Sequence, residues 1–282
     1  MSSKEVMQPC ENFIGGKWQP GSGERLPVLS PYTGAQIGEL AQSDAQDVAR
    51  AVSAAKQASV GWAATPLKER CQVMFTFRQI LHRDLAAMSK TVSLESGKTL
   101  NEARAGLLKG VEVLEFALSL QNVDEGGKME VSRGVFCEYR REPLGVVAGI
   151  TPFNFPAMVP MWMIPIAITL GNSFVWKPSE KTPMTSVLIA NALKEAGLPD
   201  GVLTVVQGGK ATVEAILDHP DIAAVGFVGS TPVARAVYQR ASSHGKRALA
   251  LGGAKNHIIL MPDAEVEMAS RGIVDSFTGC AG

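Results

Sequence analysis

Charged residues are scarce in this chain, and neither sign is in excess. Asp, Glu, Lys and Arg make up 19% of the 282 residues, below the ~25% usual for soluble domains. The 27 basic side chains balance 27 acidic ones, so the chain has no basic field for nucleic acid and no acidic solvating tail. We therefore expect no nucleic-acid partner.

Cysteine is also scarce. The widely spaced cysteines form no CxxC pair, which argues against a disulfide framework and against a zinc site, and favours a reducing compartment. The first 13 residues lack the apolar core of a secretory signal and an Arg-rich presequence, which favours the cytoplasm if residue 1 is the native start. The four cysteines are Cys10, Cys71, Cys137 and Cys280.

One apolar run is long enough to span a bilayer, at residues 155–176. Pro156, Pro160 and Pro165 interrupt it, and in lipid they would leave backbone groups unsatisfied. We expect a buried helix running into a buried strand, and no membrane partner.

The length corresponds to about two domains at roughly 150 residues each. Residues 12–40 are typical of short strands with Gly-rich and Pro-rich turns. A helix capped by Ser43 follows, and two more helical stretches cover residues 66–97 and 99–121. The first helix has an apolar face formed by Val48, Ala51, Val52 and Ala55.

Residues 124–142 change character again. A polar turn region leads into GVFCEYRREP, which alternates apolar and polar side chains like a half-exposed strand. Such a strand often adds to another sheet, so we expect a homo-oligomer in which this segment reaches a partner subunit.

Strands alternate with helices from residue 144 onward. Each of four short apolar runs ends in a polar, Gly or Pro turn that leads into a helical stretch, which predicts an α/β fold with a Rossmann-like parallel sheet and flanking helices. Ligands collect beyond the carboxyl ends of such strands. Residues 247–253 and 256–264 are two further strand candidates, followed by a helix over 265–277. The four runs are GVVAGI, NSFVW, GVLTVVQ and AAVGFV.

The turn after AAVGFV places Gly229 and Ser230 where a strand becomes a helix. Backbone N–H groups there suit a phosphate, although the usual GxGxxG fingerprint is absent. The local pattern alone favours a simple cap by Ser230 or Thr231, with Pro232 at the first helical position.

The turn after NSFVW carries Lys177 and Glu180. A carboxylate there could accept hydrogen bonds from two ribose hydroxyls and repel a 2′-phosphate, which favours NAD over NADP. The alternative is a solvated loop with an incidental salt bridge.

Asn154 lies in the turn after GVVAGI, between two aromatic residues. A rigid side-chain amide at a strand end can donate to a developing oxyanion. The commoner alternative is an Asx-turn, in which Asn154 bonds its own backbone.

Taken together, these turns resemble the aldehyde dehydrogenase superfamily from about Asn12 to Gly282. The motifs that carry the resemblance are TPFNFPAMVPMWMIPIAITLGNSFVWKPSEKTP, GFVGSTPVARAVY and LGGAKNHIILMPDA. The forms PFNFP, GSTPVA and GAKNH are most similar to the CoA-acylating methylmalonate-semialdehyde dehydrogenases, which use NAD, coenzyme A and a small aldehyde.

The resemblance implies a nicotinamide side and a catalytic amide. Thr151, Pro152 and Phe153 would line the nicotinamide side of the cofactor cleft, with Gly252 nearby. Asn154 would supply the amide of the oxyanion hole.

It also implies an adenosine side. Lys177 and Glu180 would hold the ribose, with Lys181 beside them. Gly229 and Ser230 would meet the pyrophosphate.

Two departures from the superfamily affect the chemistry. Ala250 or Leu251 stands where hydrolytic members have a Glu that activates water, and neither can accept a proton, so the acyl group would pass to coenzyme A. Lys109 stands where the branch usually has an Arg that binds the substrate carboxylate. A Lys keeps the positive charge but cannot form the bidentate contact of a guanidinium.

The family nucleophile would lie just beyond Gly282, and Cys280 is misaligned with it. His257 is expected to be structural. We therefore expect a chain truncated before the catalytic cysteine, with most of the catalytic domain missing, and inactive as it stands. The expected division is 1–123 (first part of the NAD-binding domain), 124–143 (oligomerisation segment), 144–253 (Rossmann-like core) and 254–282 (start of the catalytic domain).

The function that follows is NAD-dependent, CoA-acylating oxidation of methylmalonate or malonate semialdehyde to propionyl-CoA or acetyl-CoA. Two alternatives stay open: a hydrolytic NAD-dependent aldehyde dehydrogenase of a neighbouring branch, and a non-catalytic NAD-binding fragment.

Overall fold

The computed structural model describes residues 8–123, 126–254 and 256–278. Its largest sheet has seven strands in the order β12-β11-β8-β9-β10-β2-β3. The first five of these are parallel, and β2 runs antiparallel to β10. Their bounds are β2 (Asn12–Ile14), β3 (Lys17–Gln19), β8 (Val146–Ile150), β9 (Ser173–Lys177), β10 (Leu203–Val205), β11 (Ile222–Gly229) and β12 (Arg247–Gly252).

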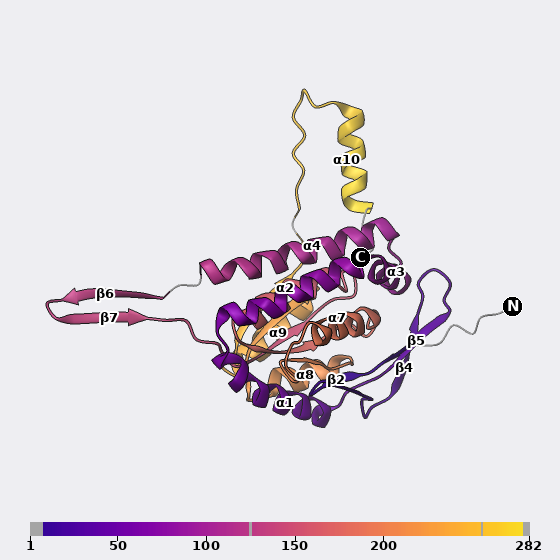
Figure 1. Cartoon of the computed structure of the whole chain (residues 1–282). Helices are drawn as coiled ribbons and strands as arrows, with labels where there is room; N and C mark the ends of the chain where they lie inside the picture. Colours follow the sequence, from indigo (N-terminus) through magenta and orange to yellow (C-terminus); the bar gives the residue numbers. More distant parts are fainter. Residues whose placement is uncertain (1–7, 124–125, 255, 279–282) are drawn as a thin grey trace.

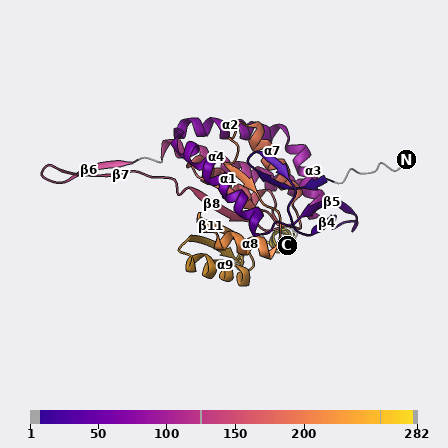
Figure 2. The same cartoon turned by 90° about the horizontal axis from the view of Figure 1, so that it is seen from below.

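Helices cover both faces of this sheet (Figures 1 and 2). All helices of the described residues, including α10, which lies away from the sheet, are α1 (Ala45–Ala64), α2 (Leu67–Arg83), α3 (Leu85–Ser96), α4 (Leu100–Ser119), η1 (Leu120–Asn122), α5 (Met158–Met161), α6 (Ile164–Thr169), α7 (Met184–Glu195), α8 (Lys210–Asp218), α9 (Thr231–Ser243) and α10 (Val266–Thr278).

Alternation along the strands builds two cores. Val147, Phe174 and Trp176 pack against α2, α4 and α7, whereas Val146 and Ala148 face α1, α8 and α9. All five residues of β8 and of β9 are buried, as expected for parallel strands with helices on both faces. The predicted α/β fold with a parallel sheet and flanking helices is confirmed.

The strand order creates a switch point beside β8. From β8 the chain moves to β9 and β10 on one side, then returns to place β11 and β12 on the other. The connections leaving β8 and β11 therefore diverge, and open α/β sheets form their ligand crevice at such a point.

The described residues form two smaller sheets besides the main one. The first has the order β1-β5-β4 and packs against α7. The second is the antiparallel hairpin β6–β7, which projects from the body (Figure 1). Their bounds are β1 (Gln8–Cys10), β4 (Arg25–Leu29), β5 (Gln36–Ala41), β6 (Gly127–Ser132) and β7 (Val135–Tyr139).

Two local predictions were wrong near helix ends. The cap of α1 is Asp44, which accepts from the N–H groups of Gln46 and Asp47, whereas Ser43 is buried and donates to Asn12 Oδ1 at 2.9 Å. The single helix expected after residue 155 is split into α5 and α6. Pro165 lies in the first turn of α6 and lacks the N–H that would continue α5.

The strand predicted over residues 256–264 is absent, although the structure describes the whole of this segment. Residues 256–260 have no strand partner, and β12 is the edge of the described sheet. The predicted helix that follows is present as α10, which projects from the body with an exposed apolar side (Figure 1). None of the helices within the described ranges is long and apolar enough to cross a membrane.

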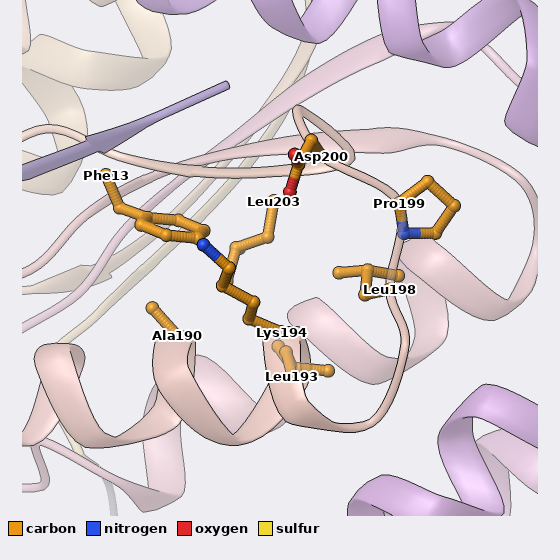
Figure 3. Close-up of a pocket in the computed structure, with 8 residues that line it drawn as sticks. All are labelled: Phe13, Ala190, Leu193, Lys194, Leu198, Pro199, Asp200 and Leu203. Carbon is orange, nitrogen blue, oxygen red and sulfur yellow. The ribbon is translucent and has the colours of Figure 1, made fainter. Parts of the chain in front are cut away.

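Where α7 meets β2 and β10, the packing leaves only a small gap. This cavity of about 10 Å³ lies beside Phe13, Lys194 and Asp200 (Figure 3). Such a volume holds at most about one water molecule, so this gap is not a ligand site.

Candidate functional site

A cleft of about 660 Å³ opens at the switch point. It lies beyond the carboxyl ends of β8, β9 and β11 and continues between α8 and α9. Seven of the residues predicted to bind cofactor line it: Thr151, Pro152, Phe153, Lys177, Glu180, Gly229 and Ser230.

Lys177 and Glu180 form a partly buried ion pair in this cleft. Lys177 is 5% exposed, and its Nζ lies 3.2 Å from Glu180 Oε2. Burial lowers the pKa of Lys177 against the opposing effect of Glu180. Burial also acts to raise the pKa of Glu180, but the charge of Lys177 and hydrogen bonds outweigh it and lower that pKa. Glu180 is therefore a carboxylate, and the pair is not the solvated surface pair that the sequence left open.

Glu180→Gln should weaken NAD binding roughly tenfold and improve NADP binding, because the amide is a weaker acceptor for ribose hydroxyls and does not repel a 2′-phosphate. Calorimetry of this chain with each dinucleotide measures both changes. Glu39→Gln is the control, since Glu39 pairs with Arg25 outside the cleft. Unchanged affinity for both cofactors would remove Glu180 from the ribose site.

Gly229 and Ser230 lie where β11 runs into α9. Ser230 is the N-cap of α9, but its side chain makes no capping hydrogen bond, and Pro232 lies in the first turn. A Cβ at Gly229 would lie 2.5 Å from the ring of Phe227, so glycine allows this close approach. The N-terminus of a 13-residue helix therefore faces the cleft, an arrangement that suits phosphate.

The turn that carries Asn154 is held by two hydrogen bonds to the residues that precede it. Trp176 Nε1 donates to Thr151 Oγ1 at 2.9 Å, and Thr182 Oγ1 donates to the carbonyl of Phe153 at 3.4 Å. Asn154 itself is half-buried in the bend that follows. It lies next to the cleft residue Phe153 but is not one of the lining residues.

Besides Asn154, three further predicted residues lie outside the cleft. Lys181 is exposed over the ring of Phe153, with Nζ 4.8 Å from its centroid, and borders a second groove beside β4. Gly252 pairs with Gly229, and its missing Cβ lets β12 pack against α9. Lys109 is exposed on α4, with Nζ 2.8 Å from Glu112 Oε2. Cys280 lies outside the described residues.

The part of the cleft between α8 and α9 was not predicted. It is a slot lined mainly by apolar side chains of the two helices. The sequence shows two amphipathic helices here, but it does not show that a gap remains between their apolar faces. The apolar side chains that line the slot are Val213, Leu217, Pro232, Val233, Ala236 and Val237.

Arg240 also lines the cleft and joins the two helices that flank the slot. Its Nε and Nη2 each donate to Asp218 at 2.7 Å, and Nη1 lies 3.2 Å from Glu214. Because Asp218 and Glu214 belong to α8, this bidentate pair links the two walls of the slot.

Arg240→Ala should weaken NAD binding about threefold to tenfold, because the walls lose the contact that sets their separation. Asp218→Asn should act in the same direction, although Asp218 does not line the cleft. Calorimetry with NAD measures both, with Arg83→Ala as control, since Arg83 makes a similar pair with Glu195 elsewhere. A loss with Arg240→Ala and none with Asp218→Asn would instead make Arg240 a direct ligand contact.

Comparison with known proteins agrees with this architecture. Residues 18–282 match the sequence profile of the aldehyde dehydrogenase family. The chain belongs to the aldehyde dehydrogenase family. It is 45% identical over 278 residues to malonate-semialdehyde dehydrogenase 1 of Geobacillus thermodenitrificans, covering 98% of this chain and 57% of that protein. It is 44% identical to malonate-semialdehyde dehydrogenase of Halalkalibacterium halodurans, covering 100% of this chain and 59% of that protein.

Solved structures show the same fold. A protein from Sinorhizobium meliloti 1021 described as a methylmalonate-semialdehyde dehydrogenase, complexed with NAD, matches with a TM-score of 0.94 and 43% identity, over 97% of this chain and 56% of that one. An NADP-dependent enzyme of E. coli matches at 0.91 with 27% identity, over 95% of this chain and 56% of that one. The fold therefore does not decide between the two cofactors. The chain spans a little over half the length of these relatives.

Proposed function

We propose that the whole protein oxidises malonate or methylmalonate semialdehyde with NAD and transfers the acyl group to coenzyme A, giving acetyl-CoA or propionyl-CoA with loss of carbon dioxide. The observation that carries this proposal is the cleft at the switch point, in which seven predicted cofactor residues meet. The names of the relatives support the class of aldehyde.

The cleft fits NAD in three places. The apolar slot between α8 and α9 suits the adenine ring, Glu180 suits the ribose, and the N-terminus of α9 with Ser230 suits the pyrophosphate. When bound, NAD supplies the hydride acceptor. Thr151, Pro152 and Phe153 would then line its reactive end, beside the turn that holds Asn154.

Asn154 would act on the aldehyde oxygen. Attack by a thiolate places negative charge on that oxygen, and an amide already fixed in position stabilises the charge without reorganising. The bonds from Trp176 to Thr151 and from Thr182 to Phe153 hold the turn for this task.

We propose coenzyme A as the acceptor of the acyl group because of the residues at the end of β12. Ala250 and Leu251 are apolar, so neither can remove a proton from water. A thioester at this site would then wait for a stronger nucleophile, such as the thiol of coenzyme A. Lys109 is proposed for the substrate carboxylate, and its ammonium would have to leave Glu112 to bind it.

The hairpin β6–β7 is proposed as the contact with another copy of the protein. Its side chains are exposed, among them Met129, Val131, Phe136 and Tyr139, and it projects from the body (Figure 1). Residues 144–253 would form the cofactor core, 1–123 its first part and 254–282 the start of the catalytic domain. We propose the cytoplasm as its location.

The decisive experiment assays the whole enzyme with malonate semialdehyde and NAD, with and without coenzyme A, and identifies the product by mass spectrometry. We expect turnover that requires coenzyme A and yields acetyl-CoA. Turnover to a free acid without coenzyme A would assign the protein to the hydrolytic branch. If the protein binds NAD but shows no turnover, it is a non-catalytic NAD-binding module.

A further inference from the structure

Lys98 is buried beside the turn of Asn154 in an unusual environment. The residue is 3% exposed, and among the described residues its Nζ has no hydrogen-bond acceptor. Instead, Nζ lies 4.2 Å from the centroid of the Phe155 ring. An ammonium group withdrawn from water gains more from such a ring face than an exposed one does.

The loop that carries Lys98 is itself rigid. Gly97 ends α3 with a positive φ of 75°, and Ser93 Oγ donates to the carbonyl of Lys98 at 2.6 Å. Thr99 then starts α4 through a capping box with Glu102. The backbone on both sides of Lys98 is therefore held, so its side chain reaches Phe155 from a fixed base.

Phe155 follows Asn154 directly in the chain. Its ring lies with Lys98, Leu107 and Pro156 around a gap of only about 10 Å³, so the ring has little room to move. The other neighbour of Asn154, Phe153, is tied through its carbonyl to Thr182. The amide is thus bracketed by one hydrogen bond and one cation–ring contact.

We infer that Lys98 is a positioning residue for the oxyanion amide and acts through the ring of Phe155. This inference rests on the proposed role of Asn154. A small displacement of a catalytic group is enough to cost much of its effect, and the oxyanion forms only during the reaction, so the loss should appear in kcat rather than in KM.

The first test measures kinetics of the whole enzyme. Lys98→Met should lower kcat roughly tenfold while the KM values for aldehyde and NAD stay within about twofold. Lys98→Arg should restore most of the rate, because it keeps a cation over the ring. Lys194→Met is the control, since Lys194 lies 5.8 Å from the centroid of Phe13 in another part of the fold.

A double-mutant cycle separates positioning from general destabilisation. In the Asn154→Ala background, Lys98→Met should cost no further rate, since the amide it positions is gone. An additive loss would overturn the inference. If Asn154→Ala alone costs no rate, the proposed oxyanion role fails instead.

Hydrogen exchange on this chain tests the positioning without any turnover. Lys98→Met should accelerate exchange in the peptide covering residues 152–158 and leave β9 unchanged. Phe155→Leu removes the same cation–ring contact from the other side, so it should reproduce this pattern. It provides the test if the Lys98 variant does not fold. If Lys98→Met accelerates exchange equally in residues 152–158 and in β9, the role of Lys98 is purely structural and the inference is overturned.

Discussion

Asn154→Ala is expected to lower the acylation rate of the whole enzyme by ~10²–10³, with NAD affinity little altered. Removing one fixed donor from an oxyanion costs this much because the charge appears in a site with few other donors. NAD binding should survive, since Asn154 does not line the cleft that holds the predicted cofactor residues.

The measurement is a single-turnover rate of NADH formation, together with calorimetry for NAD. Asn191→Ala is the matched control, because Asn191 accepts a hydrogen bond from Trp18 Nε1 at 3.0 Å at an exposed position. If Asn154→Ala instead unfolds the protein and the folded fraction keeps its rate, Asn154 supports only its own turn.

The strands of the core were predictable because their signal is local. GVVAGI and NSFVW are continuous apolar runs that end in Gly, Pro or polar turns, and they became β8 and β9, buried on both faces. The turns at their ends had to meet at one edge of the sheet, so the cluster of Thr151, Lys177 and Gly229 followed from the fold class.

Features that depend on distant neighbours were not predictable. Residues 256–264 have the composition of a strand, but β12 has no further neighbour within the described sheet, and composition cannot supply a partner. Arg240 is an ordinary charge in the sequence, and only the packing of α8 against α9 makes it the link across the slot. Lys98 gave no signal either, since its burial depends on Phe155, 57 positions later in the sequence.

Glu95 is expected to make stability fall as pH rises from about 4.5 to about 7. The side chain is buried at the end of α3 and accepts hydrogen bonds from the backbone N–H groups of Met184 at 2.7 Å and Thr185 at 3.0 Å. It thus caps α7, whose N-cap Pro183 has no side-chain donor or acceptor to offer. Burial raises the pKa of Glu95 from 4.5 to about 7, although the bonds from Thr185 and Met184 oppose this.

The sign follows from proton binding. Between these two pKa values the folded protein holds a proton on Glu95 that the unfolded chain has released, so raising the pH favours unfolding. The whole effect is roughly 3 kcal/mol, and it levels off above the folded pKa. Glu95→Gln keeps the shape and stays neutral, so it should remove this slope. It should also lower stability by a pH-independent amount, because its NH2 group replaces one of the two oxygens that accept from Met184 and Thr185.

Urea unfolding of this chain at several pH values between about 5 and about 8 measures the slope. Glu102→Gln is the control: Glu102 also caps a helix, but it is only partly buried, and hydrogen bonds from Thr99 lower its pKa. That carboxylate is ionised in both states across this range, so its loss should shift stability by a constant amount. A slope that persists in Glu95→Gln would mean that Glu95 is already ionised in the fold, held by the N-terminus of α7 rather than neutralised by burial.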